Sequence, residues 1–161
     1  MNAQFIFAML LPWLGPAYLL AVAWPLAKTD IREHRLPNRL VLPALPITLL
    51  SQLLTAWLED AWMQALLALG VAAVAFVIGL LLNRLASLGM GDVKLITVIA
   101  LALGWFSPMS PLVAVFLAFL AASLAVLPLL ILRKLSRSKS IALGPYLLGG
   151  FSAALALVPF S

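Results

Sequence analysis

The sequence lacks cysteine and contains very little charge. None of its 161 residues is Cys and only one is His. Disulfides, thiolate zinc sites and a cysteine nucleophile are therefore excluded, and so is a multi-histidine metal site. Charged residues make up 9% of the chain, against about 25% in soluble domains. So few charges cannot cover the surface of a soluble protein, which excludes a soluble enzyme, a nucleic-acid-binding domain and a disordered tail.

Apolar residues dominate instead, at 65% of the chain, with a mean hydropathy of +1.18. A membrane span needs roughly 20 mostly apolar residues. Six stretches are predicted to be spans: 5–27, 40–58, 62–82, 95–106, 112–132 and 141–160. The fourth is short and must extend into the preceding loop. Because no segment between spans is long enough to form a domain, we expect residues 1–161 to form one integral-membrane domain, an all-α bundle of about six transmembrane helices.

The basic residues are sorted between the loops. All ten lie in alternate loops: Lys28, Arg32, Arg35 and Arg39 between the first two spans, Arg84 and Lys94 between the third and fourth, and Arg133, Lys134, Arg137 and Lys139 between the fifth and sixth. Loops rich in Lys and Arg stay in the cytoplasm. The sequence therefore predicts three cytoplasmic basic loops, both termini outside, and a multi-pass protein of the cytoplasmic (inner) membrane in contact with lipid.

The chain has only five acidic residues. Glu59 and Asp60 fall in an external turn, where they act as solvated cap residues, and Glu33 lies among basic residues, where a surface ion pair is the simplest interpretation. Asp30 and Asp92 differ, because each lies near the cytoplasmic end of an apolar helix. Two spans separate them, so both carboxylates reach the same membrane face. Ionisable groups close to hydrocarbon are costly and are candidates for function.

The neighbours of Asp92 strengthen its candidacy. Gly89 and Gly91 precede it, and they permit unusual backbone angles and close approach of another segment. If Asp92 faces Asp30, the two carboxylates can share one proton. The ionised member could then activate a water while the protonated member polarises a carbonyl. This chemistry needs no metal and no cofactor. Lys94 could either anchor its helix at the lipid headgroups or hold the acidic site electrostatically.

Other functions fit the same residues. Each aspartate taken alone could form a structural ion pair, as in a non-catalytic membrane assembly subunit. A small ion- or proton-coupled transporter could also use two carboxylates as a relay. A relay should have acids near the bilayer midplane, however, and the middles of the predicted spans contain none.

Three segments together resemble a known family. Asp30 is followed by Pro37-Asn38, then come Gly89-Met90-Gly91-Asp92-Val93-Lys94, and Gly144-Pro145-Tyr146 opens the last predicted span. This order resembles the type IV prepilin peptidases, which are polytopic membrane aspartic proteases of the Gly-x-Gly-Asp type. The resemblance covers about residue 28 to the C-terminus.

The resemblance implies a function and a site. Members of the family cut the short basic leader from prepilins or pseudopilins on the cytoplasmic side, so such precursors, together with pilus or secretion assembly proteins, are the implied partners. The catalytic aspartates of the family map onto Asp30 and Asp92, with Gly89, Gly91 and Lys94 as supporting residues. Larger bacterial members carry four zinc-binding cysteines in an N-terminal methyltransferase domain. This chain resembles the short, peptidase-only form.

Overall fold

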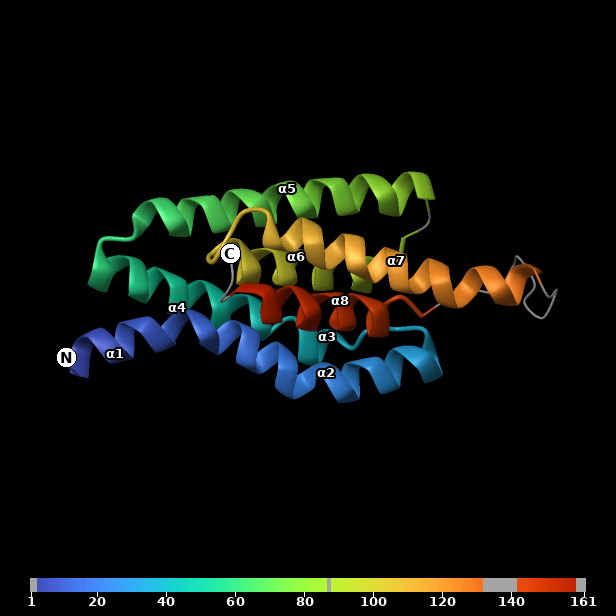
Figure 1. Ribbon diagram of the computed structural model, residues 1–161, viewed down its shortest axis with the longest axis horizontal. Coiled ribbons are helices and arrows are strands. Elements are labelled where there is room, and N and C mark those ends of the chain that lie inside the picture. The colour runs from blue at the N-terminus through green and yellow to red at the C-terminus, as the bar shows by residue number, and fades with distance from the viewer. Residues whose placement is uncertain (1–2, 87, 132–141, 159–161) are drawn as a thin grey trace.

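A computed structural model describes residues 3–86, 88–131 and 142–158, and all regular structure in these residues is helical (Figure 1). The elements are α1 (Ala3–Leu10), η1 (Leu11–Trp13), α2 (Leu14–Glu33), α3 (Asn38–Val41), α4 (Ala44–Glu59), α5 (Trp62–Ala86), α6 (Met90–Gly104), α7 (Ser110–Ile131) and α8 (Gly144–Leu157). The predicted all-α class is confirmed for the described part of the chain.

Four segments are long and apolar enough to cross a membrane: Phe7–Glu33, Asn38–Glu59, Trp62–Ala86 and Ser110–Leu127. Helices α6 and α8 are shorter, with 15 and 14 residues. At 1.5 Å per residue, α6 is about 22 Å long, which is less than the roughly 30 Å of hydrocarbon in a bilayer. The structure thus supports four of the six predicted spans, and a crossing by α6 or α8 stays a prediction.

Helix α6 lies at the centre of the bundle. It contacts α2, α3, α4, α5, α7 and α8, and each of its residues from Val98 to Gly104 is buried. A helix enclosed by other helices has no lipid-facing stripe, which explains why α6 is apolar around its whole circumference. The first turn of this central helix carries Asp92, so the surrounding helices determine what approaches that residue.

Small and polar side chains bring the other helices together. Gly150 of α8 packs against the backbone of α7, where a Cβ atom would collide with the carbonyl oxygen of Ala114. Gln52 of α4 is almost completely buried and its Nε2 donates a 2.9 Å hydrogen bond to the carbonyl oxygen of Leu101 in α6. Close packing at glycine and interhelical hydrogen bonds are the usual stabilising contacts between membrane helices.

Two helix boundaries differ from the sequence-based prediction, and both differences move a candidate aspartate. Helix α2 continues to Glu33, so Asp30 lies within the helix and not in the loop after the first span. The helix ends at His34, which has left-handed backbone angles and donates its N–H to the carbonyl oxygen of Asp30. Helix α6 begins at Met90, so Asp92 lies in its first turn. Hydropathy marks where apolar residues stop, whereas backbone hydrogen bonding continues into the polar flanks.

The C-terminal ends of α2, α5 and α7 lie at one end of the bundle, and the N-terminus and the α4–α5 turn lie at the opposite end (Figure 1). The C-terminal ends of α2 and α5, near which the first two predicted basic loops begin, therefore lie at the same end of the bundle. The third predicted basic loop, with Arg133, Lys134, Arg137 and Lys139, lies outside the described residues. Which face of the membrane each end occupies stays a prediction.

Candidate active site

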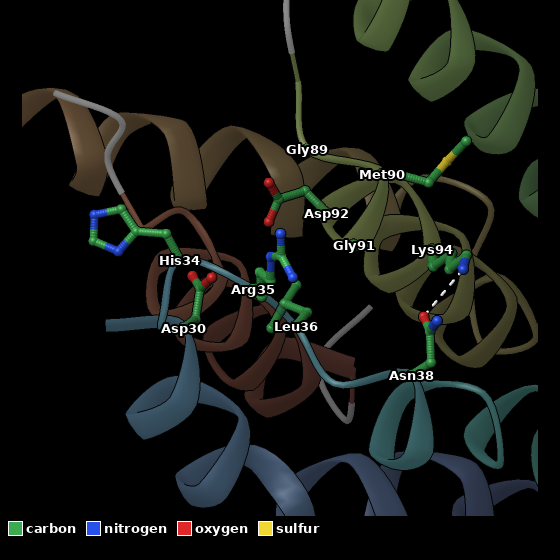
Figure 2. Close-up of a pocket in the computed structure, with 10 residues that line it drawn as sticks. All are labelled: Asp30, His34, Arg35, Leu36, Asn38, Gly89, Met90, Gly91, Asp92 and Lys94. Atoms are coloured by element: carbon green, nitrogen blue, oxygen red, sulfur yellow. Dashed lines mark hydrogen bonds between the residues drawn. The ribbon is translucent and has the colours of Figure 1, made fainter. Parts of the chain in front are cut away.

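An open pocket of about 380 Å³ lies where the end of α2, the start of α3 and the start of α6 meet (Figure 2). It is lined by Asp30, His34, Arg35, Leu36, Asn38, Gly89, Met90, Gly91, Asp92 and Lys94. All five residues singled out as site candidates from the sequence therefore line the same pocket. They come from two segments that are separated in the chain by α4 and α5.

Asp30 is hydrogen-bonded to α8, a helix that begins 114 residues further along the chain. Its side chain is 5% exposed. The backbone N–H of Gly144, the first residue of α8, donates a 2.8 Å hydrogen bond to Oδ2 of Asp30. His34, one turn further along, also interacts electrostatically with this carboxylate. The last turn of α2 thus presents Asp30 to the start of α8 and to the pocket.

Asp92 is half-buried and lies outside the four candidate spans. The pKa of Asp92 is raised from 3.8 to about 6: burial is the largest cause, the like charge of Asp30 also raises it, and a hydrogen bond from the backbone of Gly89 lowers it. A carboxylate raises the pKa of a second carboxyl group appreciably only when the two groups are close. The two carboxyl groups therefore form an interacting pair.

The glycines before Asp92 serve close approach. No glycine in the described ranges has a positive φ, and Gly89 itself is extended, with φ −60° and ψ 136°. The prediction of unusual backbone angles is therefore wrong. A Cβ atom on Gly91 would lie 2.9 Å from Cβ of Leu36, and one on Gly89 would lie 2.8 Å from Oδ2 of Asp92. Both distances are too short for carbon, so larger residues would displace Leu36 or the carboxylate.

Lys94 ties the two halves of the pocket together. Its Nζ donates a 3.0 Å hydrogen bond to Oδ1 of Asn38, which links α6 to the start of α3 (Figure 2). This hydrogen bond holds the Lys94 side chain at the edge of the pocket. The headgroup-anchor and site-holding interpretations of Lys94 both remain predictions.

Sequence patterns assigned no role in the site to three of its residues. The sequence predicts Arg35 only as a loop charge and Gly144 only as part of the family motif, and it assigns nothing to Leu36. Leu36 is buried and is the neighbour that a Cβ on either Gly91 or Gly144 would meet. Contacts of this kind join residues far apart in the chain, so no local periodicity or spacing could have revealed them.

These features define a class: an all-helical protein with several apolar segments able to cross a membrane, and an interacting pair of carboxyl groups in an open pocket at one end of the bundle. Residues 17–131, more than half of the chain, match the type IV leader peptidase family. The chain therefore belongs to this family, which confirms the resemblance stated from the motifs. The matched region includes Asp30 and Asp92 and ends before α8. No curated protein and no solved structure matches the chain significantly.

Proposed function

We propose that this protein is a membrane aspartic endopeptidase that removes the short leader from type IV prepilin-like precursors at the cytoplasmic face of the inner membrane. Membership of the type IV leader peptidase family supports leader cleavage. The observation that carries the aspartic mechanism is the electrostatic interaction of Asp30 and Asp92 in one open pocket. The proposed partners are prepilin or pseudopilin-like precursors and the proteins of pilus or secretion assembly.

In the proposed reaction, the pair of carboxyl groups holds one proton. The ionised member takes a proton from a water molecule as the water oxygen attacks the scissile carbonyl carbon. The protonated member gives its proton to the carbonyl oxygen, which forms a neutral tetrahedral intermediate. Collapse of the intermediate breaks the C–N bond. The proton taken from water goes to the leaving amine, and one hydroxyl of the intermediate returns its proton to the carboxylate that supplied it, so the product is a carboxylic acid and the pair is restored with one proton. With a pKa of about 6, Asp92 is suited to carry the shared proton up to about pH 6.

Two further features support the cytoplasmic assignment and the single-domain organisation. The pocket contains Arg35 and Lys94, and positive charge marks the cytoplasmic side. Both aspartates also depend on elements from across residues 30–144, since Gly144 of α8 holds Asp30. We therefore propose that residues 1–161 act as one peptidase domain.

The direct test is cleavage of a co-expressed prepilin by Asp30→Asn and Asp92→Asn variants. Each variant should accumulate in the membrane and leave the precursor uncut, because an amide can neither accept the proton from water nor supply the acidic proton. Asp60→Asn, the same change at an exposed turn at the other end of the bundle, is the matched control and should cleave normally. Normal cleavage by either site variant would refute the assignment of the pair.

A further inference from the structure

The start of α8 is directed at Asp30. Gly144 is the first residue of this 14-residue helix, and Leu143 is its N-cap. The N–H groups of the first turn of a helix have no partner within the helix. For Gly144 that partner is Oδ2 of Asp30, at 2.8 Å. One of the N–H groups that α8 leaves without a partner in the helix is therefore hydrogen-bonded to a carboxylate of the proposed catalytic pair.

The residue at this position can hardly be other than glycine. A Cβ atom on Gly144 would lie 2.7 Å from Oδ2 and 3.1 Å from Cγ of Asp30, and 3.1 Å from Cδ2 of Leu36. Real Cβ atoms essentially never approach another atom closer than 3.0 Å. Since the φ of Gly144 is not positive, conformational freedom does not explain the glycine. The carboxylate of Asp30 occupies the space that a Cβ atom at position 144 would need.

We infer that Gly144 is a positioning residue for the cleavage reaction: its amide, at the N-terminus of α8, fixes Asp30 and keeps it the ionised member of the pair. This inference rests on the proposed function. A backbone N–H bond to a carboxylate favours the ionised form, and the positive end of the helix dipole acts in the same direction. With Oδ2 bound to the amide, Oδ1 is left to accept the proton from water.

Among the described residues, the charged or titratable groups that line the pocket with Asp30 are His34, Arg35, Asp92 and Lys94. Asp92 faces it from α6, and His34 and Arg35 face the same pocket from the segment after α2. Helix α8 contributes no charged side chain, because its sequence contains none. The backbone amide is therefore the contribution of α8 to the charge state of Asp30.

The first test is Gly144→Ala in the full-length protein, with kcat, KM and the pH profile measured on a prepilin. The added Cβ should push Asp30 off the amide. A hydrogen bond to a charged group is typically strong enough that its loss lowers a rate roughly 10- to 100-fold, and we expect that decrease in kcat with little change in KM. Because the ionised form of Asp30 loses its hydrogen bond, the acid limb of the profile should move to higher pH.

Two glycines of the same helix provide matched controls. An added Cβ on Gly149 would meet nothing within 4 Å, so Gly149→Ala should leave activity and pH profile unchanged. Gly150→Ala, which clashes with α7 and not with the site, should lower thermal stability without moving the acid limb. Together they separate an effect on the charge of Asp30 from an effect on helix packing.

If Gly144→Ala fails to accumulate, cell-free translation with glycolic acid at position 144 replaces the amide by an ester. This removes the N–H, which no helical hydrogen bond uses, and adds no Cβ atom. It also weakens the Leu143 carbonyl oxygen as acceptor of the Leu147 N–H, an effect on the helix and not on Asp30. The same loss of kcat and shift of the acid limb are expected. An unchanged kcat and acid limb in the ester variant, or in Gly144→Ala, would overturn the inference. The proposed function fails separately, if Asp30→Asn or Asp92→Asn still cleaves.

Discussion

Asp30 and Asp92 lie close enough for the charge of one to act on the other: after burial, the charge of Asp30 is the largest influence that raises the pKa of Asp92 to about 6. The two residues come from helices α2 and α6, which enter the pocket from opposite sides (Figure 2). An interaction of this kind makes the protonation of each group depend on the other.

The first prediction concerns the pH dependence of cleavage. If Asp92 carries the shared proton, kcat/KM should fall as pH rises through about 6, approaching a tenfold decrease per pH unit. It should also fall on the acid side, where Asp30 takes up a proton and can no longer accept one from water. Steady-state assays on a detergent-solubilised protein from pH 4 to 9 would measure both limbs. A flat profile over this range would contradict the shared-proton mechanism.

The second prediction concerns stability. The pKa of Asp92 is raised in the folded protein from 3.8 to about 6, so the folded state binds the proton more tightly than the unfolded state does. The stabilisation from the bound proton is complete below pH 3.8 and is lost as pH rises through about 6. Asp92→Asn should therefore raise the melting temperature at pH 8 by roughly 2–4 °C, the shift expected from about 1 kcal/mol.

This difference between Asp92→Asn and the wild type should vanish below pH 4, where both are neutral at position 92. Asp60→Asn, at an exposed position, should show no such pH-dependent difference. A lower melting temperature for Asp92→Asn at pH 8 would show that burial of the charge is not the dominant cost at this position.

The third prediction concerns the hydrogen bond between Lys94 and Asn38, at 3.0 Å. If it holds the two sides of the pocket in register, Lys94→Met and Asn38→Ala should each lower kcat/KM by roughly fivefold, which corresponds to about 1 kcal/mol. The double variant should then be no worse than either single variant, since both remove the same bond. Additive losses would indicate that the two residues act independently, as a headgroup anchor for Lys94 would.

The fourth prediction concerns membrane sidedness, and the lack of cysteine makes it easy to test. Met109, in the α6–α7 turn, and Arg84, near the end of α5, are both exposed. A membrane-impermeant maleimide should label Met109→Cys in intact cells but label Arg84→Cys only after permeabilisation. The cysteine-free wild type gives the background. The reverse labelling pattern would place the pocket on the outer side and refute cleavage at the cytoplasmic face.

Much of the fold follows from hydropathy alone. The helical class and the four long apolar segments could be predicted because a span must be apolar over roughly 20 residues. The ends of α2 and α6 could not be located in this way. Both helices extend into polar sequence, and it is there that Asp30 and Asp92 lie. Their side chains line a pocket where the end of α2 meets the starts of α3 and α6, and hydropathy does not detect which segments meet.

The site itself was predicted in part. Scarcity of charge identified Asp30 and Asp92 as candidates, because an ionisable group next to a membrane span is energetically costly and is often kept for function. The glycine motif lines the pocket, and its role in the site stays a prediction; the backbone angles are ordinary, and Gly91 makes room for Leu36. The contact with Leu36 joins residues on different helices, and it becomes visible only when the helices are packed.

The sequence by itself determined the class of the protein, the sorting of its basic residues and the two acids available for chemistry, because these depend on composition and on order along the chain. Only the tertiary structure decided that Asp30 and Asp92 interact and that the first amide of α8 binds Asp30. The physical reason is that electrostatic and hydrogen-bonding energies depend on distances of a few ångströms. The packing of α2, α6 and α8 sets those distances between residues that are up to 114 positions apart.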